Sequence, residues 1–165
     1  MSRSINSIIE SAHSRLKVPE GPHTYYRYPA RFSPKFARSV ISAYSRQGDL
    51  VIDPFLGGGT TAVEARVMGR RFIGTDINPL AIFISKVKST PLENNSINDL
   101  IDFKDTLSSA IQKDVREKPF TLPKEIEHDP KIWRLYSCMI NAIECCKLIP
   151  EKHARDFVKC VVIKT

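Results

Sequence analysis

The stretch Val51-Ile52-Asp53-Pro54-Phe55-Leu56-Gly57-Gly58-Gly59-Thr60-Thr61 decides the fold class of this chain of 165 residues. It opens with a short β-branched apolar run, which is typical of a buried parallel strand. A carboxylate ends the run, a glycine-rich turn follows, and a helical pattern begins after the turn. Open parallel sheets bind ligands beyond the carboxyl ends of their strands. The stretch therefore predicts a strand–turn–helix unit whose turn presents backbone to a small ligand.

A second unit of the same kind follows directly. The run 71–76 predicts another strand that ends in a carboxylate, and Asn78-Pro79 is typical of the start of a helix over 80–88. Two parallel strands joined by a helix need a right-handed crossover. The sequence therefore predicts an α/β fold with a parallel β-α-β-α unit.

Helix ends can be predicted from local patterns as well. We expect Thr61 and Glu64 to form a capping box for the helix after the turn, and Gly69 to end that helix. Ser33-Pro34 is typical of an N-cap followed by a first-turn proline. The expected upstream elements are a helix over 4–17 that covers an edge of the domain, a loop over 18–31 and a helix over 34–45.

The chain changes character after Pro91, so we expect one part over 1–92 and a helical segment over 93–165. The elements expected there are a helix over 97–111, a proline-bearing loop over 118–129, and helices over 132–148 and 154–163, with a strand at 161–163 as the alternative. Trp133 is expected to anchor a helix face. Two strands alone do not make a stable open sheet, so the predicted sheet is incomplete.

Composition indicates a cytoplasmic protein. No apolar run approaches the roughly 20 residues that span a bilayer, and the first residues lack the apolar core of a signal peptide. The four cysteines form no CxxC pair, so we expect reduced thiols and no metal site.

A basic, aromatic segment precedes the first strand. The net charge is +7, and the stretch from Ser11 to Gly48 contains seven lysine and arginine residues but one acidic residue, Glu20. The cations are Arg15, Lys17, Arg27, Arg31, Lys35, Arg38 and Arg46, and the interleaved aromatic residues are Tyr25, Tyr26, Tyr28 and Phe32. Cations neutralise phosphates and aromatic rings stack on bases. The segment favours either nucleic-acid contact or a solvated basic face.

The carboxylates at the two strand ends indicate a nucleoside ligand. Asp53 and Asp76 lie one turn, one helix and one strand apart, and a carboxylate after the second strand can accept two hydrogen bonds from a ribose diol. The turn is not a phosphate-binding P-loop, because no lysine precedes Thr60-Thr61. A cofactor without phosphates suits it better.

Three motifs in order resemble the N4-cytosine/N6-adenine DNA methyltransferases, which use S-adenosylmethionine. The stretch 53–61 resembles their cofactor motif, and Gly74-Thr75-Asp76-Ile77-Asn78 is similar to their ribose-binding motif. The stretch 23–36, HTYYRYPARFSPKF, resembles the segment that packs over the methionine end of the cofactor. The resemblance runs from about His23 to Pro91 and implies an incomplete Rossmann-like methyltransferase domain followed by the helical segment.

The resemblance also implies residue roles. Asp53 should contact the methionine amino end, the Gly57–Gly59 backbone should lie along the cofactor, and Asp76 should hold the ribose. Ile77 should contact the adenine, while Phe32 and Ser33 close the methionine side. The expected cofactor residues are Phe32, Ser33, Asp53, Pro54, Phe55, Gly57, Gly58, Gly59, Thr60, Thr61, Asp76 and Ile77. DNA is the expected partner, through Arg27, Arg31, Lys35 and their neighbours.

One family motif is missing. The catalytic motif, a polar residue followed by Pro-Pro and an aromatic residue, does not occur, because no two of the eleven prolines are adjacent. We expect no catalytic residue here, and no role as a base for His13, His23, His128 or His153, which lack visible partners. Methyl transfer is expected to need a second polypeptide with that motif or to be lost. The alternatives are a fragment of an RNA amino-methyltransferase and a non-catalytic remnant that binds nucleic acid or a partner.

Overall fold

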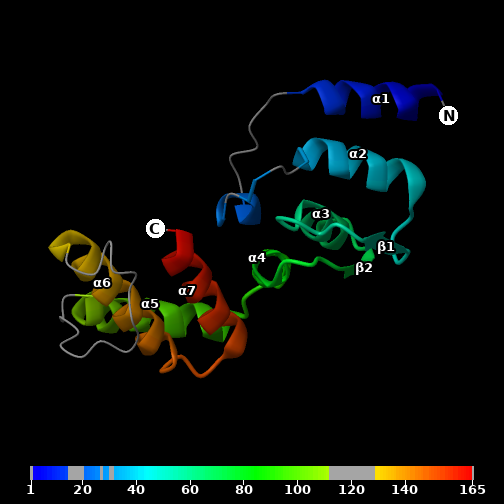
Figure 1. Ribbon diagram of the computed structural model, residues 1–165. Coiled ribbons are helices and arrows are strands. Elements are labelled where there is room, and N and C mark those ends of the chain that lie inside the picture. Colours follow the sequence, from blue (N-terminus) through cyan, green and yellow to red (C-terminus); the bar gives the residue numbers. More distant parts are fainter. Residues whose placement is uncertain (1, 15–20, 27, 30–31, 112–128, 165) are drawn as a thin grey trace. The chain divides into compact units, whose positions relative to one another are not determined.

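The computed structural model describes residues 2–14, 21–26, 28–29, 32–111 and 129–164 (Figure 1). The chain divides into two compact units, one up to Pro91 and one from Leu92 to Ile163. In the described residues it is largely helical, with one two-stranded sheet.

The sheet of the first unit carries the strand ends on which the site depends. Strand β1 (Leu50–Asp53) pairs in parallel with β2 (Arg71–Gly74), with Asp53 opposite Gly74. The positions of both strands are confirmed, although β2 ends two residues earlier than expected. The expectation of a buried strand was wrong, because Leu50, Ile52 and Ile73 are exposed on the two-stranded sheet. Beyond the strands the backbones stay paired, because Thr75 N–H donates to Asp53 O at 3.0 Å and Leu56 N–H donates to Thr75 O at 3.0 Å. Asp53 and Asp76 are thereby held at the same edge.

Four α-helices and a short 3-10 helix complete this unit. They are α1 (Ser2–His13), η1 (Gly21–Thr24), α2 (Pro34–Tyr44), α3 (Thr60–Val67) and α4 (Pro79–Ser89). Helix α1 runs beside α2, α2 packs on α3, and α3 contacts both strands and α4 (Figure 1). Helix α3 is central to the core, with Ala62, Val63 and Ala65 buried. On the sheet, Ile52 remains 65% exposed.

Of the three predicted helix starts, one is confirmed in full, one in position alone, and one is wrong. Asn78 is confirmed as the N-cap of α4, because its side chain accepts a hydrogen bond from Leu80 N–H and Pro79 follows it. Ser33 is the N-cap of α2 by position, but its side chain makes no capping hydrogen bond. The capping box was wrong: Gly59 is the N-cap of α3, and Glu64 points to other partners. Gly69 adopts the left-handed conformation expected at the helix end, with φ 74°.

The described residues of the second unit form α5 (Asn94–Ile111), α6 (Pro130–Cys146) and α7 (Lys152–Lys164). Its core includes Phe103, Ala142, Cys146 and Val158. The strand alternative at 161–163 is wrong, since α7 continues through these residues. Trp133 is half-buried on α6, with its ring centroid 5.5 Å from that of Tyr136, as expected for a helix-face anchor. The expected loop over 118–129 lies outside the described residues except for Asp129.

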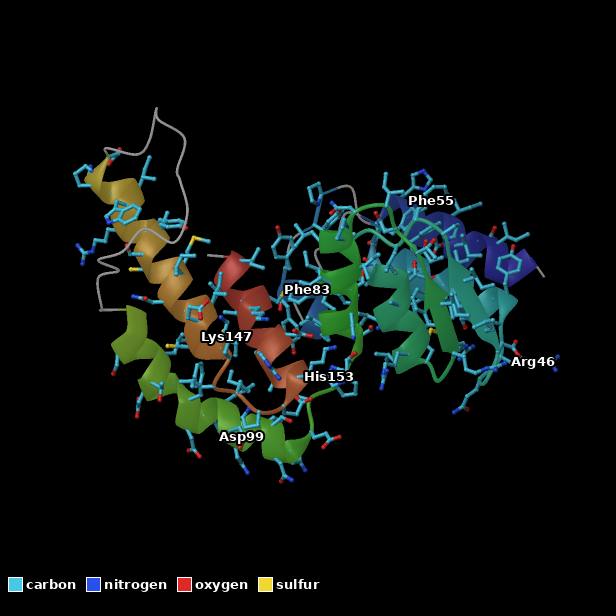
Figure 2. The ribbon with its side chains drawn as sticks, turned by 60° about the horizontal axis from the view of Figure 1, so that its bottom comes forward. Arg46, Phe55, Phe83, Asp99, Lys147 and His153 are labelled. Atoms are coloured by element: carbon cyan, nitrogen blue, oxygen red, sulfur yellow. The ribbon has the colours of Figure 1, made fainter. Side chains whose placement is uncertain are left out.

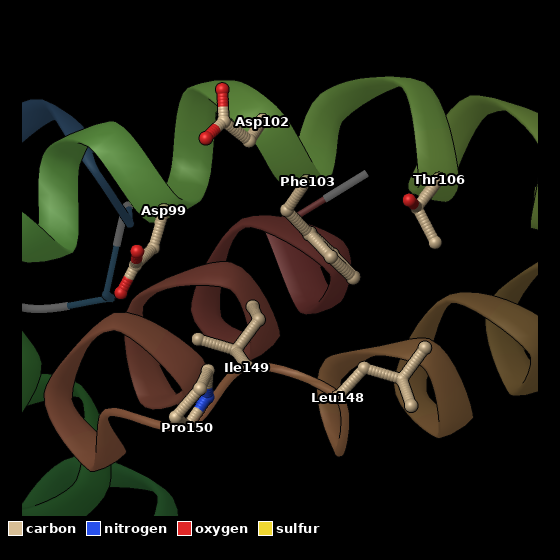
Figure 3. Close-up of a pocket in the computed structure, with 7 residues that line it drawn as sticks. All are labelled: Asp99, Asp102, Phe103, Thr106, Leu148, Ile149 and Pro150. Carbon is tan, nitrogen blue, oxygen red and sulfur yellow. The ribbon is translucent and has the colours of Figure 1, made fainter.

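A hollow of about 300 Å³ in the second unit is shown in Figure 3. Its lining is Asp99, Asp102, Phe103 and Thr106 of α5 with Leu148, Ile149 and Pro150 after α6. The Asp102 carboxylate points away from Phe103 and Ile149 (Figure 3). None of the predicted cofactor residues lines this hollow.

Candidate cofactor site

Two backbone hydrogen bonds hold the Asp76 carboxylate, one from the glycine turn and one from the start of α4. Its Oδ2 accepts from Gly57 N–H and its Oδ1 accepts from Asn78 N–H, each at 2.8 Å. The hydrogen bonds from Asn78 and Gly57 hold the pKa of the Asp76 carboxyl below its ordinary value. The group is therefore charged at neutral pH. Each oxygen accepts one of these bonds and has a further lone pair for a ligand hydroxyl.

Asp53 lies at the end of the neighbouring strand. Its Oδ1 accepts a hydrogen bond from Phe55 N–H at 3.0 Å, which shapes the start of the turn. Its Oδ2 has no hydrogen-bond partner among the described residues. The two carboxylates thus frame the turn, and each has acceptor capacity left.

Each of the three turn positions requires glycine for a different physical reason. A Cβ on Gly57 would meet nothing closer than 3.8 Å, while its φ of 49° is a conformation that L residues rarely adopt. A Cβ on Gly58 would lie 2.7 Å from Tyr28 Cβ, and one on Gly59 would lie 2.5 Å from Ser85 Oγ. Packing within the chain therefore requires two of these glycines, which the expectation of ligand approach alone did not anticipate.

The segment before α2 is hydrogen-bonded onto the turn. The Lys88 ammonium, on a buried side chain, donates to Tyr26 O at 2.6 Å and to Gly58 O at 3.1 Å. Asn78 Nδ2 donates to Tyr28 Oη at 3.0 Å, and Ser85 Oγ donates to Gly57 O at 3.0 Å. Sequence reasoning named Asn78 and Tyr28 but missed Lys88 and Ser85. The available signal was the helical spacing of Ile84, Val87 and Lys88, which puts a lysine on the inward face.

A buried carboxylate joins three elements behind the turn. Glu64, which is 1% exposed, has its Oε1 2.8 Å from His23 Nε2, and its Oε2 accepts from Arg38 Nε at 2.7 Å. Burial alone would raise the pKa of Glu64, but the hydrogen bonds and charges of His23 and Arg38 outweigh burial and lower it. We call these three residues the Glu64 network. It gives His23 a partner that the sequence did not reveal.

The remaining predicted residues occupy varied environments. The Phe55 ring is 85% exposed (Figure 2), and Ile77 is fully exposed. Phe32 is exposed and packs on Phe36, with ring centroids 5.7 Å apart. Pro54 is exposed, Thr60 is buried and Thr61 is half-buried.

Ser33 and the predicted DNA contacts need separate mention. The Ser33 hydroxyl is buried and has no hydrogen-bond partner among the described residues. No described hydrogen bond joins Phe32 or Ser33 to the glycine turn. Lys35 is exposed on the first turn of α2, whereas Arg27 and Arg31 lie outside the described residues.

Comparison with known proteins decides the family. The family of N6/N4 methyltransferases, described as DNA methylase, matches residues 5–87, which is half of the chain. The chain belongs to the DNA methylase family. The matched region contains all the predicted cofactor residues. The two-stranded parallel sheet and its helices are compatible with part of a methyltransferase domain.

Curated relatives of the chain agree with this family assignment. Type II methyltransferase M.MvaI of Kocuria varians is 38% identical over 82 residues, which are 48% of this chain and 18% of that protein. Type II methyltransferase M.MjaII of Methanocaldococcus jannaschii is 38% identical over 66 residues, 40% of this chain and 12% of that protein. The tRNA (guanine(10)-N2)-dimethyltransferase of the same organism is 34% identical over 76 residues, 45% of this chain and 22% of that protein.

The chain thus matches between 12% and 22% of the length of these relatives. No solved structure matches it significantly. The comparisons give no support for a second polypeptide. Among the described helices, none combines the length and the apolar character that crossing a membrane requires.

Proposed function

We propose that residues 1–92 form the S-adenosylmethionine-binding part of a DNA amino-methyltransferase with a Rossmann-like core, and that residues 93–165 form a separate helical part. The observation that carries the proposal is the Asp76 carboxylate, fixed to the glycine turn by Gly57 N–H at 2.8 Å. This contact places a charged acceptor at the start of the turn, where Gly57 is half-buried and Gly58 and Gly59 are buried. An acceptor pair of this kind matches the two hydroxyls of a ribose.

The chemistry of the neighbouring groups fits the rest of the cofactor. Asp53 Oδ2 can accept from the methionine ammonium, and the buried Ser33 hydroxyl has an unused donor for the methionine carboxylate. The exposed apolar side chains of Ile77 and Phe55 offer surface for the adenine. S-adenosylmethionine, when bound, supplies an activated methyl group. The chain's own residues bind and orient it, and they hold its ribose through Asp76.

Calorimetric titration with S-adenosylmethionine tests the proposal. The wild-type chain should bind it, and Asp76→Ala should lose about 1–3 kcal/mol of affinity, because ribose hydroxyls are left unpaired. Asp99→Ala, which removes an exposed carboxylate from α5, is the matched control and should bind like the wild type. A folded wild-type chain that gives no binding heat would remove the proposal.

The acceptor class is the second part of the proposal. DNA is favoured by the family match and by the type II relatives. Of the three cations predicted by name to contact DNA, Lys35 is the one whose position the structure describes. RNA is the second candidate, because a tRNA dimethyltransferase is 34% identical over 76 residues. Since the Pro-Pro-aromatic motif is missing from these residues, we infer that this chain alone transfers no methyl group.

A methyl-transfer assay with labelled S-adenosylmethionine separates these candidates. It compares duplex DNA with tRNA as the acceptor, in an extract of the source cells and with the isolated chain. Label in DNA and none in tRNA is the expected result. Label in tRNA alone would favour the RNA reading. Label from the isolated chain would overturn the inference that it lacks a catalytic group.

A further inference from the structure

A polar cleft of about 470 Å³ lies between α1 and α2. From α1 it is lined by Ser7, Glu10, Ser11 and Ser14 at the end of the helix. From α2 it is lined by Lys35, Arg38 and Ser39. We call it the serine cleft. It contains none of the predicted cofactor residues.

Helix α1 turns its polar side toward this cleft. Ser11 is 8% exposed, whereas Ile9 is 51% exposed and Ile5 is exposed as well. A surface helix usually turns its apolar stripe toward the domain. The inverted orientation lines the space between two packed helices with hydroxyl and charged groups. Such a lining favours a polar occupant.

Hydrogen-bond donors without protein partners converge on the serine cleft. The Ser14 hydroxyl is buried and has no partner among the described residues. The hydroxyls of Ser7 and Ser39 and the Lys35 ammonium likewise make no hydrogen bond with described residues. Arg38 uses Nε for Glu64, so its two terminal nitrogens have donors to spare. A buried donor without a partner is costly, so an acceptor in the cleft would be favourable.

We propose that the serine cleft binds a phosphate group of the DNA backbone. A phosphate presents several charged acceptor oxygens, which match a lysine point charge, an arginine fork and serine hydroxyls. Arginine, lysine and serine are among the side chains that contact DNA phosphates in protein–DNA complexes. Glu10 is the single carboxylate in the lining, and its charge opposes the anion. The proposal rests on the proposed action on DNA and adds a contact site to it.

Four variants of the full chain separate this site from general basic charge. Lys35→Gln removes the ammonium, and Lys86→Gln removes an exposed lysine from α4 as the matched control. Glu10→Gln removes the opposing carboxylate. Ser14→Ala removes the buried donor, and because it leaves no new unpaired group it should not lower the melting temperature.

The first measurement is the affinity for a DNA duplex as a function of salt. One lost phosphate contact lowers the slope of log K against log salt by about one, which we expect for Lys35→Gln and not for Lys86→Gln. Glu10→Gln should tighten binding and Ser14→Ala should weaken it. An unchanged slope in Lys35→Gln, or weaker binding in Glu10→Gln, would overturn the proposal.

Titration with inorganic phosphate, followed by backbone amide chemical shifts, is the second arm. Shifts confined to α1 and the first turns of α2 are expected, and they should disappear in Lys35→Gln. Shifts elsewhere or none would overturn the site. If phosphate binds there but the chain shows no DNA affinity, then DNA is wrong as the source of the phosphate and the proposed action on DNA fails with it. If S-adenosylmethionine binds normally in that case, the cofactor proposal stands.

Discussion

Removal of the Glu64 carboxylate should destabilise the first unit strongly. Breaking a buried ion pair by removing one partner costs about 3–5 kcal/mol, because the other partner is left uncompensated. Here Arg38 is 58% exposed, so water can replace Glu64 at its guanidinium. His23 is 7% exposed and cannot be rehydrated as easily. Glu64→Ala should therefore cost about 3 kcal/mol, at the lower end of that range.

Amide hydrogen exchange is the suitable assay, because it reports on each unit separately. In Glu64→Ala the free energy of exchange of the α3 amides should fall by about 3 kcal/mol. The amides of α6, in the second unit, serve as an internal reference. Arg66→Ala, which removes an exposed side chain from the same helix, is the control variant and should change α3 protection by less than about 0.5 kcal/mol.

Two outcomes would refute this reasoning. If Glu64→Ala lowers α3 protection no more than Arg66→Ala does, the network contributes no stability. If Glu64→Gln, which keeps the shape and one acceptor oxygen but replaces the other oxygen with an NH2 donor, costs as much as Glu64→Ala, the side-chain hydrogen bonds contribute nothing to the effect. We expect Glu64→Gln to cost about half as much, because its amide oxygen can still accept one hydrogen bond from the network.

Further predictions concern pH, the turn and the buried lysine. The pKa of Glu64 is below its ordinary value in the folded chain. The stability that its ionised form contributes is therefore fully present above about pH 4.3 and is lost as the pH falls through the folded pKa. The free energy of unfolding should fall less steeply with decreasing pH in Glu64→Gln than in the wild type, as measured by urea unfolding at a series of acidic pH values. Gly58→Ala places a Cβ 2.7 Å from Tyr28 Cβ and should lower the free energy of unfolding in urea by about 1–3 kcal/mol. A smaller loss of stability in Gly58→Ala than in Gly57→Ala would contradict this packing. Lys88→Met removes the ammonium that donates to Tyr26 O and Gly58 O. It should lower the free energy of unfolding in urea by about 1.5–3 kcal/mol. The control Lys86→Met, at an exposed lysine of the same helix, should leave this free energy unchanged.

Features with a local cause could be predicted from the sequence. The apolar run ending at Asp53 gave β1, Asn78-Pro79 gave the start of α4, and Gly69 gave the end of α3. In each case neighbouring residues fix the backbone by themselves. The same holds for the placement of Asp53 and Asp76 at one sheet edge, since parallel strands bring their carboxyl ends together.

Features that depend on distant residues could not be predicted. Glu64 has the right type and spacing for a capping box, but His23 and Arg38, 41 and 26 residues away, bind it instead. A buried carboxylate is stabilised more by its hydrogen bond from the Arg38 guanidinium and its contact with His23 than by capping a helix, because Gly59 already serves as the N-cap of α3. Nothing in the sequence pairs these residues. The same limit applies to Tyr28, whose packing on Gly58 joins segments 30 residues apart.

Backbone amide shifts of the wild-type chain titrated with S-adenosylmethionine test the central claim most directly. Saturable shifts should centre on Gly57, Gly58 and Ile77 and extend to Ser33. Shifts centred on Asp99 and Ile149 in the second unit, or no shifts from a chain with protected α3 amides, would contradict a methyl-donor site at the glycine turn.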